Sequence, residues 1–140
     1  MSEAVVVDTN FLVRVFLSGN EGRDAIFRKI SQLRLKLVYG REQFDELFEV
    51  LGYIRITKKH NIDRDKLIRF RDWIVRKGVE IDSETVSLCR DPDDNYILGL
   101  ALDSSRSRKT YLVTSDKDML VLNKKIKNVV ICTPGEFLEI

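Results

Sequence analysis

Four short clusters of acidic and small polar residues stand out, because carboxylates gathered at one place need a cation or a proton to offset their repulsion. The clusters are Val7-Asp8-Thr9-Asn10, Asp45-Glu46, Asp91-Pro92-Asp93-Asp94-Asn95 and Thr114-Ser115-Asp116-Lys117-Asp118. At least two of them follow an apolar stretch that is typical of a β-strand. Carboxylates without histidine or cysteine suit magnesium or manganese better than zinc. The pattern therefore predicts a divalent-metal site.

Asp8 directly follows three valines and is itself followed by Thr9 and Asn10. Helix capping is one explanation, since Asp, Thr and Asn all cap well and an apolar helix is expected next. Three successive small polar groups nevertheless exceed the needs of one cap. The sequence therefore favours a functional role for Asp8, with capping as the alternative.

Asp94 has the strongest physical argument. If Asp91 caps a helix that begins at Pro92, Asp93 and Asp94 lie in its first turn, where the helix dipole tolerates acidic groups. Helical spacing then puts Asp94 on one face with three apolar residues, Ile97, Leu98 and Ala101. An unpaired carboxylate on such a buried face costs on the order of several kcal/mol. A functional role is favoured for Asp94, whereas both interpretations stay open for Asp93.

Asp116 and Asp118 flank Lys117 just after a predicted strand. Ser115 and Asp118 could form a variant of the capping box, with Asp116 as a further first-turn acid. This alternative suits Asp118 better than Asp116, which lies closest to the strand end. Glu46 sits among several acidic residues of a predicted helix, and its spacing alone does not single it out as a ligand.

Other chemistries fit the sequence poorly. The single histidine, His60, cannot supply both the acid and the base of a metal-free ribonuclease. The segment Gly19-Asn20-Glu21-Gly22 matches neither the dinucleotide nor the nucleotide phosphate-binding fingerprint. A phosphatase of the haloacid dehalogenase type would need a second acid two residues after Asp8, where this chain has an asparagine. Cys89 and Cys132 lack metal-binding spacing and are expected to be buried or incidental thiols.

Strands and helices are expected to alternate along the chain. Apolar segments predict strands at about 5–7, 35–39, 79–81, 110–113 and 129–131. The segments between them predict helices at about 11–17, 22–34, 42–59, 64–77, 92–102 and 117–123, with a turn at 134–138. The alternation indicates an α/β protein, a three-layer α/β/α sandwich around a mostly parallel sheet. Ligands bind such sheets beyond the carboxyl ends of the strands, and Asp8 and Asp116 each lie just past such an end.

The composition is that of one domain, 1–140, with 44% apolar and 33% charged residues. No apolar run approaches the length of a membrane span and no signal peptide is visible, so a cytoplasmic protein is expected. Residues 53–77 carry nine basic and three acidic side chains, and residues 78–103 carry one basic and seven acidic. The basic segment suits a protein that holds a polyanion near bound cations, with a solvated helix face as the alternative. Its aromatic residues are expected in the core: Tyr53, Phe70 and Trp73.

Taken together, these motifs resemble the PIN-domain nucleases, in particular VapC-like toxins. The resemblance covers nearly the whole chain. Besides the clusters around Asp8, Asp94 and Asp116, it includes the helix Glu46-Leu47-Phe48-Glu49-Val50-Leu51 and the ending Thr133-Pro134-Gly135-Glu136-Phe137-Leu138. It implies a PIN-like fold, cleavage of single-stranded RNA, a homodimer and, for a toxin, an antitoxin partner. The basic segment 53–77 departs from compact relatives.

The resemblance also implies the roles of individual residues. An acidic quartet would surround magnesium or manganese: Asp8, Glu46, Asp94 and Asp116. Of these, the metal ligands would be Asp8, Asp94 and Asp116, with Glu46 assisting. Asp118 could add a ligand or an outer contact, and three further residues would orient the site through hydrogen bonds: Asn10, Thr114 and Ser115.

The sequence thus predicts a magnesium- or manganese-dependent endoribonuclease that hydrolyses phosphodiester bonds of single-stranded RNA. Glu46 or Asp94 would orient or deprotonate the attacking water. The RNA backbone would be held by basic residues of 53–77 and beyond, among them Lys58, Lys59, Arg90 and Lys117. The alternative is a non-catalytic module of the same fold that binds nucleic acid or a partner.

Overall fold

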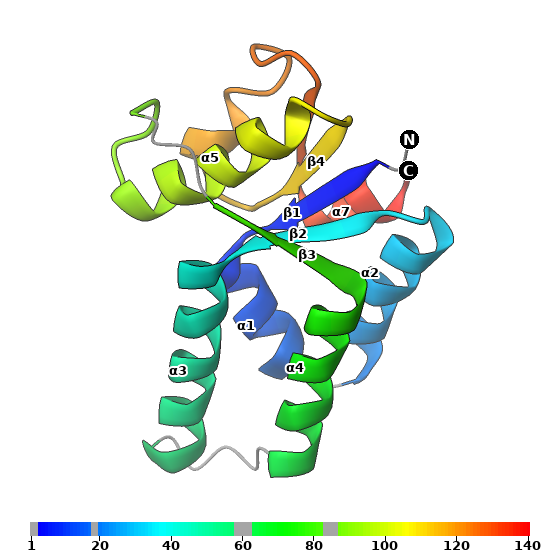
Figure 1. Ribbon diagram of the computed structural model, residues 1–140, viewed down its shortest axis with the longest axis vertical. Coiled ribbons are helices and arrows are strands. Elements are labelled where there is room, and N and C mark those ends of the chain that lie inside the picture. The colour runs from blue at the N-terminus through cyan, green and yellow to red at the C-terminus, as the bar shows by residue number, and fades with distance from the viewer. Residues whose placement is uncertain (1–2, 18–19, 58–62, 83–86) are drawn as a thin grey trace.

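In the computed structural model the chain forms a five-stranded sheet between two layers of helices (Figure 1). The structure describes residues 3–17, 20–57, 63–82 and 87–140, with the backbone alone at 20–24 and 56–57. The strands are β1 (Ala4–Val7), β2 (Lys36–Gly40), β3 (Gly78–Ile81), β4 (Thr110–Val113) and β5 (Val129–Cys132). The helices are α1 (Thr9–Leu17), α2 (Asn20–Gln32), α3 (Arg41–Thr57), α4 (Arg64–Lys77), α5 (Pro92–Ser105), α6 (Lys117–Leu120) and α7 (Pro134–Leu138).

All neighbouring strands pair in parallel, in the order β3-β2-β1-β4-β5. The sheet therefore grows from β1 to one side through β2 and β3, and then to the other side through β4 and β5. Val7 of β1 lies opposite Val113 of β4. The strand order thus reverses between the carboxyl ends of β1 and β4, where ligands bind in sheets of this kind. The predicted α/β/α sandwich is confirmed, and its sheet is wholly parallel.

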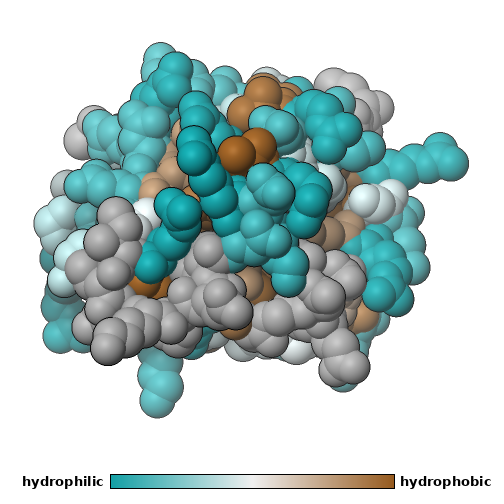
Figure 2. Space-filling model, turned by 90° about the horizontal axis from the view of Figure 1, so that it is seen from below, coloured by the Kyte–Doolittle hydropathy of each residue, from teal (hydrophilic) through white to brown (hydrophobic). Residues whose placement is uncertain are grey.

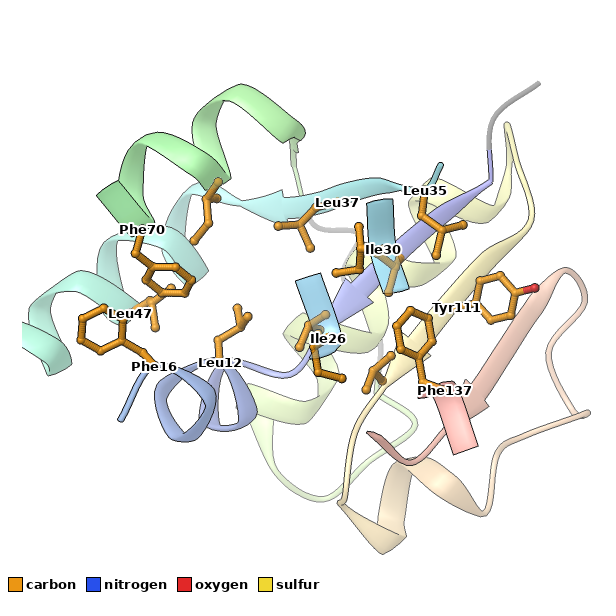
Figure 3. Packing of buried hydrophobic residues seen from close by; sticks show 14 of the residues in the cluster. Leu12, Phe16, Ile26, Ile30, Leu35, Leu37, Leu47, Phe70, Tyr111 and Phe137 are labelled. Atoms are coloured by element: carbon orange, nitrogen blue, oxygen red, sulfur yellow. The ribbon is translucent and has the colours of Figure 1, made fainter. Parts of the chain in front are cut away.

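The two faces of the sheet bury separate cores, because successive strand residues point to opposite sides. Val5 and Val7 face a core that is shared with α1 to α4 and α7, whereas Ala4 and Val6 face a core that is shared with α5 and α6. Figure 3 shows the first of these cores, in which side chains of α1 to α4 and α7 lie against those of the sheet. Since all four β1 side chains are buried, the strand that ends at Asp8 is held from both faces.

Helix α4 packs through aromatic side chains and exposes its basic ones. Phe70 is buried, and its ring centroid lies 5.9 Å from that of Phe48 on α3. The Trp73 ring stacks on Phe27 of α2 at 4.1 Å. The expectation of core positions is confirmed for Phe70 and Trp73. It is wrong for Tyr53, which is 60% exposed because α3 turns that side away from the core.

Seen from the end of α3 and α4, the surface is mostly hydrophilic, with apolar side chains in small patches (Figure 2). The described basic residues of α4 are all exposed: Arg64, Lys66, Arg69, Arg71, Arg76 and Lys77. Among the helices of the described residues, none combines the length and apolarity needed to cross a membrane.

Local capping explains where two helices begin. Asp91 caps α5 and Pro92 is its first residue, as predicted. The ending 134–138 is a helix instead of the predicted turn, because Thr133 and Glu136 form a reciprocal capping box. The Thr133 hydroxyl accepts the Glu136 N–H at 3.1 Å, and Glu136 Oε1 accepts the Thr133 N–H at 2.9 Å.

Candidate metal centre

Asp8 is fixed at the carboxyl end of β1 by groups from both sides. Its backbone N–H donates to the Val113 carbonyl of β4 at 3.0 Å. Its Oδ1 accepts the backbone N–H of Asn10 at 3.1 Å, and its Oδ2 accepts the Thr114 hydroxyl at 3.0 Å. Both carboxylate oxygens therefore have a set direction. Asn10 contributes through its backbone, and its side chain is exposed.

Thr114 connects Asp8 to the last acidic cluster. It is fully buried, and its hydroxyl, which donates to Asp8, also accepts the backbone N–H of Asp116 at 3.1 Å. A hydroxyl can donate and accept at once, so a single side chain sets the spacing of the two acidic residues. The structure thus brings Asp8 and Asp116 together across the point where the strand order reverses.

Helix α6 is capped by Asp116, whose Oδ1 accepts the Asp118 N–H at 2.8 Å. The alternative of a capping box between Ser115 and Asp118 is therefore wrong, because the helix begins one residue later than that motif requires. Ser115 is exposed instead. The cap uses Oδ1 of Asp116, so capping and ion binding by the same side chain are compatible.

Three carboxylates converge next to this cap. Asp94 at the start of α5 and Asp116 and Asp118 at the start of α6 each place one oxygen within 4.8 Å of the others. All three side chains are half-buried. The structure therefore forms an acidic centre from the beginnings of two helices that pack on the same face of the sheet. We call these three residues the acidic centre.

The electrostatics of the acidic centre favour a cation. Burial, followed by the charge of Asp116 and a hydrogen bond to it, raises the pKa of Asp94 to about 7; Asp91 and Asp8 add to the effect. The raised pKa means that Asp94 and the carboxylates around it cannot all ionise freely in this partly buried place. A divalent cation would remove this conflict, and a set of carboxylate oxygens fits magnesium or manganese.

The acidic centre overlaps with the predicted metal ligands without being identical to them. It contains Asp94 and Asp116, together with Asp118, which was expected in a supporting role. Asp8 is not one of the three converging carboxylates, although its negative charge helps to raise the pKa of Asp94. Glu46 is exposed on α3, and its pKa is raised by burial and then by Asp93, Glu49 and Glu42. The residue of α5 whose charge acts on the pKa of Glu46 is therefore Asp93.

Arg90 is the cation that the described structure places against the acidic centre. Its Nη2 lies 3.3 Å from both oxygens of Asp118, and the Arg90 side chain is 90% exposed. Lys117, beside the centre on α6, is exposed. Lys58 and Lys59, which were predicted to contact RNA, lie outside the described residues.

Asn95, which the sequence analysis did not assign, holds the segment in front of α5. Its Oδ1 accepts the Cys89 N–H at 2.8 Å and its Nδ2 donates to the Cys89 carbonyl at 3.0 Å. These two bonds fix the backbone next to Arg90. An asparagine directly after the helix start was the available signal, since it is a poor choice inside a helix unless its amide bonds to backbone.

Gln43 and Tyr96 were also missed. Gln43 is buried, and its Nε2 donates to the Val7 carbonyl at 2.7 Å, one residue before Asp8. Tyr96 of α5 accepts backbone hydrogen bonds from Glu42 and Gln43 at the start of α3. The signal for Gln43 was a polar residue four positions before Leu47, on the buried face of its helix.

Both cysteines are free thiols. The Cys89 Sγ lies 4.0 Å from the Asp118 carbonyl, and burial, followed by the surrounding aspartates, raises its pKa. Burial raises the pKa of Cys132 to about 11. Both thiols therefore stay protonated at neutral pH.

A family model described as "PIN domain" matches residues 4–118, which include every carboxylate of the site. The chain is also 28% identical over 146 aligned positions to the uncharacterized protein MJ1680 of Methanocaldococcus jannaschii, covering 96% of this chain and 89% of that relative. No solved structure gives a significant match.

Proposed function

Because the chain belongs to the PIN-domain family, we propose that it is an endoribonuclease that hydrolyses phosphodiester bonds of single-stranded RNA with Mg²⁺ or Mn²⁺. PIN domains are generally metal-dependent nucleases, and PIN nucleases generally act on RNA. The observation that carries the proposal is the convergence of Asp94, Asp116 and Asp118 beside the point where the strand order reverses. This place and this donor set suit a cation that faces a phosphate.

The side chains divide the work between holding the ion and orienting the site. Asp94 and Asp116 would hold the cation together with Asp118 or Asp8. A bound Mg²⁺ or Mn²⁺ would lower the pKa of a water molecule and offset negative charge on the scissile phosphate. Thr114 fixes the direction of Asp8. Glu46 or Asp94 would orient the water or accept its proton.

The RNA backbone would be held by cations around the acidic centre. Arg90 pairs with Asp118, so an ion that binds Asp118 would free the Arg90 guanidinium for a phosphate. Lys117 would add a second contact, and Lys58 and Lys59 further ones. A homodimer and a role as a toxin with an antitoxin partner belong to the same proposal and rest on the family resemblance. The single domain 1–140 is proposed from the length and composition of the chain.

Cleavage by site variants tests the proposal. The purified protein is incubated with a labelled single-stranded RNA and Mn²⁺, alongside Asp8→Asn, Asp94→Asn and Asp116→Asn. Each variant should lose activity by roughly 100-fold or more, because it removes an ion ligand or the group that orients one. Asp72→Asn is the matched control, since Asp72 is an exposed aspartate of α4; this variant should cleave like the wild type.

The outcomes separate the proposal from its alternatives. RNA binding without cleavage by the wild type, at any concentration of Mg²⁺ or Mn²⁺, would support the non-catalytic module instead. Equal cleavage by wild type and all three site variants would identify a contaminating nuclease and remove the site assignment. Cleavage of single-stranded DNA at the same rate would exclude RNA selectivity.

A further inference from the structure

A pocket of about 330 Å³ opens at the carboxyl edge of the sheet, where the acidic centre also lies, but on the opposite face, which α1, α2 and α7 cover. Its walls come from α1, α2 and α7 and are mainly apolar: Phe11, Val15, Ala25, Ile26, Pro134 and Leu138. Two polar residues, Arg14 and Ser115, complete the lining. The volume is at the lower end of the roughly 300–1,000 Å³ that ligand sites occupy. The pocket therefore suits a small, flat and largely apolar group.

Residues that line the pocket are close in sequence to residues of the acidic site. Ser115 lies between Thr114, whose hydroxyl bonds to Asp8, and Asp116. Phe11 lies in the first turn of α1, which begins where the Asp8 carbonyl accepts the N–H of Leu12 at 3.0 Å. A strand with a phosphate at the acidic centre would thus have a neighbouring nucleotide at the pocket.

The side chains at the pocket match the chemistry of a nucleobase. The guanidinium carbon of exposed Arg14 lies 5.9 Å from the centroid of the Phe11 ring. Aromatic rings and guanidinium planes both stack on bases, and Arg14 and Ser115 offer hydrogen-bond groups to a base edge. Among the described residues that line the pocket none is acidic. Arg14 is therefore the charged group that the described lining presents to an RNA strand.

We infer that this pocket receives one unstacked base of the RNA strand, next to the phosphate that is cleaved. The inference rests on the proposed function and names how that site selects its substrate. A base in a duplex is stacked and paired and must be turned out at a cost, whereas a base in a single strand is free to enter. The pocket would therefore restrict cleavage to single-stranded RNA.

The test has two parts: substitutions that narrow the pocket in the protein, and removal of single bases from the RNA. Ala25→Leu narrows the pocket, and Gln32→Leu places a leucine at an exposed position on the same helix, outside the pocket. Arg14→Ala removes an exposed stacking group without touching the core, and Arg28→Ala is its control on α2. Circular dichroism and thermal unfolding establish that all four variants fold. The RNA carries one abasic site or one 2-aminopurine, moved along the strand one nucleotide at a time.

At one position beside the cleaved bond, an abasic site should slow cleavage by the wild type roughly five- to hundredfold, the range expected for one stacked base. At that position 2-aminopurine fluorescence should change on binding to metal-free wild type, Gln32→Leu and Arg28→Ala. The change should be lost in Ala25→Leu and weakened in Arg14→Ala.

The inference is overturned if abasic sites at all positions are cleaved alike, or if Ala25→Leu and Arg14→Ala bind and cleave like their controls. Normal RNA binding by Ala25→Leu with loss of a co-purifying protein would overturn it in favour of a protein site. Absence of cleavage by the wild type would refute the proposed function alone, since the fluorescence arm reports on the pocket without metal.

Discussion

Asp94 is a residue whose charge the metal-free protein does not accommodate well. Burial of its carboxyl group and the neighbouring charge of Asp116 together raise its pKa from the usual 3.8 to about 7. The folded chain thus keeps a proton on Asp94 in a pH range where the unfolded chain releases it. Such a site is poised to exchange a proton for a cation, and this competition ties metal binding to pH.

The raised pKa predicts how stability depends on pH. Because the pKa of Asp94 is higher in the folded than in the unfolded chain, its contribution is fully present below about pH 3.8 and is lost as the pH rises through about 7. The side chain in Asp94→Asn cannot ionise. The free energy of unfolding of this variant, relative to that of the wild type, should therefore be higher at pH 8 than at pH 5. Urea unfolding in EDTA at both pH values measures this, with Asp72→Asn as the control. A difference between Asp94→Asn and wild type that is the same at both pH values would contradict the prediction.

At the residue scale the sequence predicted that carboxylates gather at one edge of the sheet, but not which of them converge. Strand ends and helical spacing pointed to Asp8, Asp94 and Asp116, which the structure brings to one edge of the sheet. The place of Asp118 in the acidic centre depends on where α6 begins, because Asp116 takes the cap position that the capping-box alternative gave to Ser115. A shift of one residue at a helix start is below what spacing can resolve.

At the level of the elements, α3 begins without a capping side chain of its own. It follows β2 directly, and the residue before its first turn is Gly40, which has no side chain to accept a hydrogen bond. The Tyr96 phenol oxygen of α5 accepts the N–H groups of Glu42 and Gln43 instead. A Cβ at Gly40 would collide with this phenol oxygen. The start of the helix that carries Glu46 is thus fixed by the helix that carries Asp94.

Tyr96→Phe is expected to weaken this junction. The change removes the acceptor and keeps the ring, so it should lower the free energy of unfolding by about 1 kcal/mol, the typical value for a lost cap or hydrogen bond. Urea unfolding measures it. Asp72→Asn, a change at an exposed position of α4, is the control and should change stability by less than about 0.5 kcal/mol. Equal stability of Tyr96→Phe and the control would show that the phenol oxygen does not cap α3.

The elements themselves were well predicted where local signals were complete. The strands Val5–Val7 and Thr110–Val113 were found from their apolar runs, and α5 from its Asp-Pro start. The long-range contacts of Gln43 and Tyr96 could not be predicted in this way. Each joins segments that are far apart in the sequence, whereas hydrophobic periodicity and helix propensity describe one segment at a time. Their partners are set by the packing of α3 against β1 and α5, which no local rule contains.

On the scale of the whole molecule, the end of α4 and the acidic centre lie at opposite edges of the sheet. The carboxyl ends of β1 and β4 lead into Asp8 and the acidic centre, whereas α4 leads into the amino end of β3 (Figure 1). Lys77, the last residue of α4, is therefore at the edge opposite Lys117. The alternative of a solvated helix face consequently fits the end of α4 better than a direct phosphate contact beside the site.

This arrangement predicts that two exposed lysines differ in RNA binding. Lys117→Gln removes a cation beside the acidic centre and should reduce the slope of log binding constant against log salt by roughly 0.7, the value for one phosphate contact on a single strand. Lys77→Gln makes the same chemical change at the opposite edge and should leave both the slope and the affinity unchanged. Titration of a short single-stranded RNA at several salt concentrations, with EDTA to prevent cleavage, measures the two slopes. A reduced slope for Lys77→Gln with a normal one for Lys117→Gln would instead place the bound strand along α4.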